Sequence, residues 1–402
     1  MWEQIRSNRI RSVILVAGMG ALLLLLGYFL GLTFLGNPAA GIVIALLLWA
    51  VMNLVAYFQG DSILLAVSGA RKITRDDHPR LYNIAEEMKI ASGLEKMPDI
   101  YIIDDPAPNA FAAGRSPQKA SLAVTSGLLE KLNRDELQGV VGHEISHIKN
   151  RDVMLMSLAG VILGTVVILA WYATRMLFFS GMAGNRRSSR SEGGGQGQII
   201  ILAVGIVLMI LAPIAAQLLY YAISRKREYL ADASSALYTR YPDGLASALE
   251  KVAASTQQLK TANKATAPMY IINPFRERGL AASDLTSTHP PISKRIRILR
   301  AMAGASLADY NQAYQGITGG GVIPASALAG AGLVAFRPAA ASTGAEEETA
   351  DRLKRTRETS NLMWRLGNYR TVTCQCGTNL RVPATFKAPG IRCPHCGRIN
   401  PL

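Results

Sequence analysis

One short segment of the sequence, His143-Glu-Ile-Ser-His147, has the residue types and the spacing of a zinc hydrolase. Residues four positions apart lie on the same face of an α-helix, so both imidazoles can reach one metal ion. A glutamate beside the first histidine is placed to act as the general base in peptide-bond hydrolysis. The segment therefore predicts His143 and His147 as ligands of a catalytic zinc and Glu144 as a catalytic residue.

A second polar pair, Glu228 and Asp232, has the same spacing and follows a long apolar run. A hydrolytic zinc site has three protein ligands and one open position. Glu228 can supply the third ligand, and Asp232 can accept a hydrogen bond from a ligand imidazole and so fix its tautomer. Alone, these two carboxylates would suggest a solvated helix face. Together with the two histidines they predict a complete metal site.

The residues around the histidines predict the helix that must position them. Asn133 is a favoured N-cap, and Glu136 three residues later fits a capping box. Leu137, Val140 and Val141 follow at helical spacing, which gives the same helix an apolar face. We therefore expect a buried helix that carries His143 and His147.

Four almost uncharged apolar runs predict membrane-spanning helices, at residues 13–35, 39–58, 153–179 and 199–222. Each is long enough to cross about 30 Å of hydrocarbon. Only 18% of the chain is charged, and residues 12–60 contain no Asp, Glu, Lys or Arg, which excludes an ordinary soluble enzyme. The last two runs separate the two histidines from Glu228, so the site must lie at the membrane surface.

Basic residues predict the orientation in the membrane. The chain has 43 Lys and Arg against 28 Asp and Glu, with 12 of the basic residues in 61–152 and 24 in 225–402. Segments rich in Lys and Arg stay on the cytoplasmic side. We expect a multi-pass integral protein of a bacterial or archaeal plasma membrane, with the catalytic site and both termini in the cytoplasm. Three arginines in the loop 181–198 oppose this, so the third and fourth runs could instead enter the bilayer without crossing it.

The chain resembles the HtpX-like membrane metallopeptidases, relatives of the CaaX prenyl endopeptidases in the gluzincin group. The resemblance covers roughly residues 1–302. It rests on five segments in the family order, which are Asn109-Ala-Phe-Ala-Ala-Gly114, His143-Glu-Ile-Ser-His147, Ser224-Arg-Lys-Arg-Glu-Tyr-Leu-Ala-Asp232, Ile272-Asn-Pro274 and Thr288-His-Pro-Pro291. It implies a zinc endopeptidase that acts on misfolded or membrane proteins in membrane-protein quality control and the stress response.

The resemblance also assigns two further groups. His289 is implied as the residue that stabilises the oxyanion; the alternative is that it only forms a turn with the two prolines that follow it. Residues 109–114 and 120–125 read as short strands. An edge strand beside the cleft could bind the substrate backbone by strand addition, and the alternative is a plain core strand. In the resemblance, the first strand lies beside the cleft and binds the substrate backbone through Asn109, Ala110 and Phe111.

All four cysteines lie in the last 29 residues, as the pairs Cys374 with Cys376 and Cys393 with Cys396. Each pair is followed by a glycine, which is typical of a zinc ribbon, whereas a disulfide scaffold would distribute them more widely. Four thiolates are the simplest ligand set for a second, structural zinc, with His395 as the alternative ligand. This module lies outside the resemblance. We expect it to bind either a protein partner or the substrate. Its basic residues leave lipid head groups and nucleic acid as less favoured alternatives, since no nucleic-acid-binding motif occurs.

These features predict a mainly α, α+β membrane metalloprotease with four hydrophobic helices, a small sheet and a C-terminal zinc ribbon. We expect substrates to be unfolded or membrane proteins. A catalytically latent scaffold that presents the ribbon is the alternative, and the intact Glu144 argues against it. The expected units are a membrane hairpin (1–60), a first catalytic part (61–152), a second membrane hairpin (153–222), a second catalytic part (223–303), a flexible linker (304–360) and the ribbon-like module (361–402).

Overall fold

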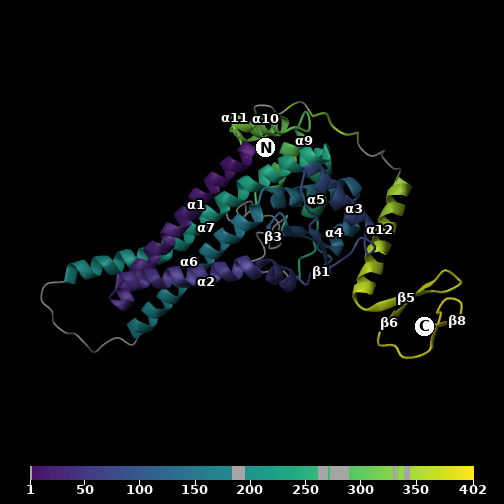
Figure 1. Cartoon of the computed structure of the whole chain (residues 1–402), viewed down its shortest axis with the longest axis horizontal. Helices are drawn as coiled ribbons and strands as arrows, with labels where there is room; N and C mark the ends of the chain where they lie inside the picture. The colour runs from purple at the N-terminus through teal and green to yellow at the C-terminus, as the bar shows by residue number, and fades with distance from the viewer. Residues whose placement is uncertain are drawn as a thin grey trace.

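The computed structural model describes residues 2–182, 195–260, 270–271, 289–328, 332, 334–338 and 345–402. Figure 1 shows long helices that extend away from a smaller body of helices and strands, with the C-terminal module on the far side of that body. Helices dominate the described chain, and the strands form one four-stranded sheet and two hairpins. The predicted mainly α, α+β fold is therefore confirmed.

The long helices contain the four predicted apolar runs. They are α1 (Trp2–Leu30), which a π-helical turn (Gly31–Leu35) extends, α2 (Pro38–Val67), α6 (Asp152–Met182) and α7 (Gly195–Thr239). Each contains a stretch long and apolar enough to cross a membrane. Buried residues from α1, α2, α6 and α7, among them Met19, Ala45, Ile162 and Ala216, form a common core between these helices.

A small sheet borders the base of the long helices (Figure 1). Its strands are β1 (Arg71–Lys72), β2 (Asp99–Ile103), β3 (Ala110–Ser116) and β4 (Lys119–Thr125), in the order β1-β2-β4-β3. Strands β2 and β4 are parallel, and the other two pairs are antiparallel. The two predicted strands are confirmed, and β3 lies at the edge of the sheet.

Helix α5 (Arg134–Lys149) is the central helix of the smaller body and carries the two histidines. The predicted capping box is confirmed, because Asn133 Oδ1 accepts from Glu136 N–H and the Glu136 carboxylate accepts from Asn133 N–H. The side chains of Leu137, Val140 and Val141 are fully buried. Helix α5 packs against α3 (Pro79–Ser92), α8 (Pro242–Ala253) and α7. Helix α4 (Ser126–Lys131) precedes α5 in the chain, and α9 (Ile292–Arg300) packs against α8.

The structure differs from the flexible linker expected over residues 304–360. Helix α10 (Leu307–Thr318) begins at a capping box of Ser306 and Asp309 and buries Tyr310 in the main core. A short helix, α11 (Ala325–Leu328), follows, and α12 (Ala345–Leu366) packs on α4 through the fully buried Leu362. A composition rich in Ala and Gly suggested a linker, so the Ser306 cap and the residues that become buried, Tyr310 and Leu362, were not recognised. Residues 329–331, 333 and 339–344 lie outside the described chain.

The C-terminal module consists of two antiparallel hairpins. The first pairs β5 (Tyr369–Thr373) with β6 (Asn379–Pro383), and the second pairs β7 (Gly390–Arg392) with β8 (Ile399–Pro401). Helix α12 connects the module to the smaller body and is itself bound there, since Arg365 donates to the carbonyl of Asp77 at 2.8 Å. The module is thus attached through a docked helix.

The N-cap of α3 gives a prediction for the stability of the fold. His78 Nδ1 accepts from Leu81 N–H at 3.2 Å, and burial together with the charge of Arg80 lowers the pKa of His78 from 6.5 to about 4. A lowered pKa means that the unfolded chain takes up a proton before the folded chain does. Stability is therefore complete above pH 6.5 and falls by about 3 kcal/mol towards pH 4.

We expect the His78→Asn substitution, which keeps an N-cap acceptor, to flatten the dependence of Tm on pH between pH 6.5 and 4. The measurement is thermal unfolding of the detergent-solubilised protein at several pH values. If the slope of Tm against pH is the same in the variant, the pKa of His78 is not the cause.

Candidate active site

Three metal-binding side chains converge where α5 and α7 cross. The Nε2 atoms of His143 and His147 lie 3.2 Å apart, and the Glu228 carboxylate oxygens lie 3.6 Å from His143 Nε2 and 3.3 Å from His147 Nε2. Zinc binds nitrogen and oxygen at about 2.0–2.1 Å, so the edges of its coordination tetrahedron are roughly 3.3–3.4 Å long. Glu228 turns Oε2 towards His143 and Oε1 towards His147, so the spacings between the three side chains are close to the edges of such a tetrahedron, and the donor set fits zinc.

Each ligand histidine has its own carboxylate. His143 Nδ1 lies 3.0 Å from Asp232 Oδ1, and His147 Nδ1 lies 3.0 Å from Asp152 Oδ2. A carboxylate at Nδ1 accepts the proton of that nitrogen and leaves the lone pair of Nε2 for a metal. The structure thus places Asp232 where the sequence predicted it. It also adds Asp152, which sequence reasoning missed.

Arg295 is a second residue that sequence reasoning missed. Its side chain is fully buried and donates to both oxygens of Asp232, at 2.8 and 2.7 Å. Its Nη1 atom also lies 3.3 Å from Glu228 Oε2. A planar guanidinium can make this two-pronged contact in a way that a lysine cannot. The signal in the sequence was its place in Lys294-Arg-Ile296, which closely follows the segment Thr288-His-Pro-Pro291, although no role was assigned to it.

Glu144 lies between the metal-binding side chains and strand β3. Its side chain is 2% exposed and accepts a hydrogen bond from the backbone N–H of Ala112. Burial raises the pKa of Glu144, while the neighbouring histidine charges and the Ala112 N–H oppose that rise. The carboxylate is therefore fixed beside the edge of the sheet, where a general base would meet an extended peptide.

His289 lies in the same cluster, although it is distant in sequence. Its Nδ1 atom is 3.1 Å from Glu228 Oε2, and its side chain is buried. The structure therefore brings together every residue predicted for the metal site and its chemistry. Of the segments behind the resemblance, residues 272–274 and Thr288 lie outside the described chain, as does most of the loop 181–198.

The edge strand β3 is partly covered where substrate binding was expected. Asn109, Ala110 and Phe111 are buried. The Ala110 carbonyl accepts from Ile271 N–H at 3.0 Å, and the Phe111 ring packs edge-on against Tyr270. In an antiparallel pair, the backbone N–H and C=O groups of successive residues point alternately towards and away from the neighbouring strand. Asn109 is hydrogen-bonded to Thr125 of β4, so the backbone groups of Ala110, Ala112 and Gly114 point away from β4. The next outward-facing positions are Ala112 and Gly114.

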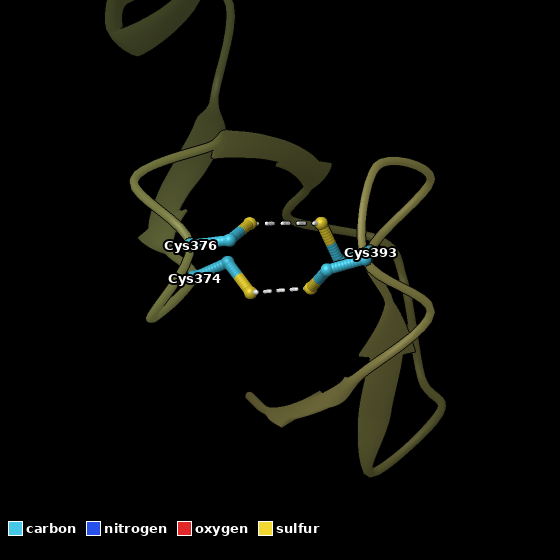
Figure 2. Close-up of side chains that lie close together, drawn as sticks. Cys374, Cys376 and Cys393 are labelled. Carbon is cyan, nitrogen blue, oxygen red and sulfur yellow. Dashed lines mark hydrogen bonds between the residues drawn. The ribbon is translucent and has the colours of Figure 1, made fainter.

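The four cysteines form a second cluster, in the C-terminal module. Figure 2 shows each hairpin contributing one pair, with the sulfur atoms facing one another. Cys374 Sγ lies 3.5 Å from Cys396 Sγ, and Cys376 Sγ lies 3.7 Å from Cys393 Sγ. Zinc–sulfur bonds of about 2.3 Å give tetrahedral edges of roughly 3.8 Å. All four sulfurs fall within 4.8 Å of one another, so four free thiols fit one zinc without His395.

Comparisons with known proteins agree with this arrangement. The family model "Peptidase family M48" matches residues 76–303. The protease HtpX homolog of Dictyoglomus turgidum is 46% identical over 301 residues, which is 75% of this chain and 94% of that protein. The protease HtpX homolog of Thermoanaerobacter pseudethanolicus is 39% identical over 302 residues, which is 75% of this chain and 98% of that protein.

Among solved structures, the chain is similar to Ste24p of S. mikatae. The alignment covers 74% of this chain and 67% of that chain, with 18% sequence identity and a TM-score of 0.43.

Proposed function

Because the chain belongs to peptidase family M48 and is a membrane metalloprotease, we propose that it hydrolyses peptide bonds of unfolded and membrane proteins at the cytoplasmic surface of the bilayer. One observation carries the proposal. The donor atoms of His143, His147 and Glu228 form one triangle, and Glu144 lies between that triangle and a sheet edge. This arrangement would place a metal, a base and an extended chain side by side.

We propose zinc as the metal at this site, held by His143, His147 and Glu228. When bound there, zinc polarises the scissile carbonyl and makes a water molecule more acidic. The Glu144 carboxylate takes the proton of the attacking water on a carboxylate oxygen and later gives it to the leaving amine. Asp232 and Asp152 hold the two imidazoles in the tautomer that leaves Nε2 free.

We propose that substrates bind by adding a strand to the outer edge of β3. Main-chain hydrogen bonds make this mode of recognition largely independent of sequence, which suits an enzyme that removes unfolded chains. Since Ile271 already pairs with Ala110 and the Ala112 N–H is bound to Glu144, the substrate would pair with the carbonyl of Ala112 and with Gly114 rather than with residues 109–111. This register keeps the peptide next to Glu144, which binds the N–H of Ala112.

The position of the site next to the membrane helices supports the proposal that substrates come from the membrane. Asp152, the first residue of α6, lies five positions after His147, and Glu228 lies within α7 itself. At 1.5 Å per helical residue, each ligand is on the order of 10 Å from the apolar part of its membrane helix. We propose that the site and both termini face the cytoplasm. Residues 1–60 and 153–222 would form the membrane part, with 61–152 and 223–303 forming the catalytic part.

We propose a second zinc, with a structural role, at the four cysteines. Four thiolates close the coordination sphere, and a closed site holds a fold together rather than binding substrate. Residues 359–402 contain no Asp or Glu, so this module presents a basic surface. A protein partner with an acidic surface would fit it.

The function is tested by casein cleavage with the detergent-purified protein after loading with zinc. We expect cleavage that a chelator removes and added zinc restores, with two zinc ions bound per chain. Two bound zinc ions without any cleavage would instead support the latent scaffold.

The role of His289 gives a separate prediction. As the donor that stabilises the oxyanion, His289 should contribute mainly to kcat, and we expect His289→Ala to lower kcat by about 10²–10³-fold with little loss of zinc. The measurement combines casein kinetics with the zinc content of the same sample. His289→Gln, which keeps an N–H donor, should recover part of the rate. A loss of zinc in both variants would show that His289 acts through its contact with Glu228 instead.

A further inference from the structure

A buried ion pair lies on the far side of His147 from the metal-binding atoms. Asp152 Oδ2 is 3.0 Å from His147 Nδ1, and Asp152 Oδ1 forms an ion pair with Arg227 Nη1. Both side chains are only 3% exposed. One carboxylate therefore serves two partners, the imidazole through one oxygen and the guanidinium through the other.

The two residues belong to the two membrane helices that separate the zinc ligands in sequence. Asp152 is the first residue of α6, and Arg227 lies on α7 immediately before Glu228. Strands and helices of the smaller body contribute neither residue. The pair thus lies at the junction where one apolar helix leaves the site and the other returns to it.

The same arrangement occurs on the other ligand histidine. His143 Nδ1 faces Asp232, and Arg295 holds both oxygens of that carboxylate. In that case α9 supplies the arginine, from the smaller body. Each ligand imidazole therefore contacts an aspartate that is itself paired with an arginine. Helices α6 and α7 supply the pair at His147, whereas α7 and α9 supply the pair at His143.

Asp152 and Arg227 are both buried, and an unpaired charged group in the interior is strongly destabilising, so the Arg227 contact holds the Asp152 carboxylate at its position. The Asp152 oxygen beside Nδ1 in turn favours the His147 tautomer with the proton on Nδ1. The contact of Arg227 with Asp152 therefore links Arg227 to the ring of His147 through one shared carboxylate.

We propose that Asp152 and Arg227 are positioning residues for His147, and that they make metal affinity depend on the junction between α6 and α7. The inference rests on the proposed binding of zinc by His143, His147 and Glu228. Asp152 fixes the proton and the ring orientation of His147, and Arg227 fixes Asp152.

The test is metal affinity of the full-length protein, measured by titration with Co²⁺ and with zinc against a chromophoric chelator. Thiolate-to-cobalt absorption identifies the cysteine site, so the His-His-Glu site can be titrated separately. We expect Asp152→Ala to weaken zinc binding at the His-His-Glu site by about 10–100-fold. Asp152→Asn, which still accepts a hydrogen bond from Nδ1, should lose less. The cobalt spectrum of that site should change in Asp152→Ala and stay close to the parent spectrum in Asp152→Asn.

A double-mutant cycle separates positioning from simple stabilisation. We expect Arg227→Met to weaken metal binding, and the pair Asp152→Ala with Arg227→Met to be no worse than Asp152→Ala alone. Additive losses in the double variant would overturn the proposal, because Arg227 would then act without Asp152. Unchanged metal affinity in Asp152→Ala would overturn it as well.

A matched control uses another buried aspartate of the smaller body. Asp105 is fully buried and accepts from Ala107 N–H and Lys260 N–H, and none of its described contacts is with the three metal ligands. Asp105→Ala should lower the Tm of the metal-free protein and leave the affinity of the His-His-Glu site unchanged. If the parent protein binds no metal at the His-His-Glu site, the proposed function is wrong. If the parent binds metal there but the metal affinities of the variants differ from those expected, only this inference is wrong.

Discussion

Replacing Glu144 with glutamine is expected to lower kcat/KM for casein by about 10³–10⁴-fold while both zinc ions stay bound. The amide has nearly the shape of the carboxylate but cannot accept a proton at neutral pH. The Glu144 side chain is buried and held by the Ala112 N–H, so a glutamine can occupy the same space. The loss should fall mainly on kcat, since Glu144 moves a proton in the transition state and contributes little to substrate binding.

Two measurements on one sample check this expectation, namely casein kinetics and the zinc content per chain. Glu95→Gln is a matched control, because Glu95 is an exposed glutamate whose described side-chain contact is a long hydrogen bond from Gln118. It should leave kcat/KM unchanged. Substantial cleavage by Glu144→Gln would mean that another group takes the proton, and loss of zinc in that variant would make the kinetic result a metal effect.

Replacing Arg295 with methionine is expected to be the most destabilising single change at the site. Arg295 is fully buried and holds both oxygens of Asp232, and it also approaches Glu228. Removing Arg295 takes away a positive charge that balances the buried carboxylates of Asp232 and Glu228. Breaking a buried ion pair in this way costs about 3–5 kcal/mol of folding stability. Methionine keeps most of the volume, so the loss of charge rather than a cavity should dominate.

Thermal and denaturant unfolding of the metal-free protein would measure this loss. Arg297→Met is the matched control, since Arg297 is exposed and lies on the same helix two residues further on. The pair Arg295→Met with Asp232→Asn should recover part of the stability, because it removes the buried charge that Arg295 compensates. If Arg295→Met unfolds at the same temperature as Arg297→Met, the ion pair with Asp232 contributes nothing to stability.

Local patterns in the sequence were enough to predict the helix that carries the histidines. The N-cap at Asn133, the apolar face of α5 and the spacing of His143 and His147 are all set within one helix. The four long apolar helices were predictable for a related reason, since hydropathy over some twenty residues is also a local property. Glu228 could be found because an acidic pair at helical spacing follows the last apolar run.

The groups that hold the ligands could not be found in this way. Arg295 reaches Asp232 across 63 positions, and Arg227 reaches Asp152 across the whole membrane hairpin. No periodicity links residues that meet only after the chain has folded. The same limit applies to strand β3, where Ile271 covers Ala110 from a distant segment. The helices in residues 304–360 were missed for a different reason, because a composition rich in Ala and Gly outweighed the cap at Ser306.

Helix α7 joins the membrane and the metal site in one continuous element of 45 residues, about 68 Å long at 1.5 Å per residue. A helix of this length adapts to a bilayer that is too thin or too thick by tilting or by bending, and Pro213 within α7 is where a bend is favoured. Because Glu228 lies on the same helix as the membrane segment, a change in tilt is carried to the metal site. We therefore expect the lipid composition that sets bilayer thickness to influence the position of Glu228 and, with it, the geometry of the metal site.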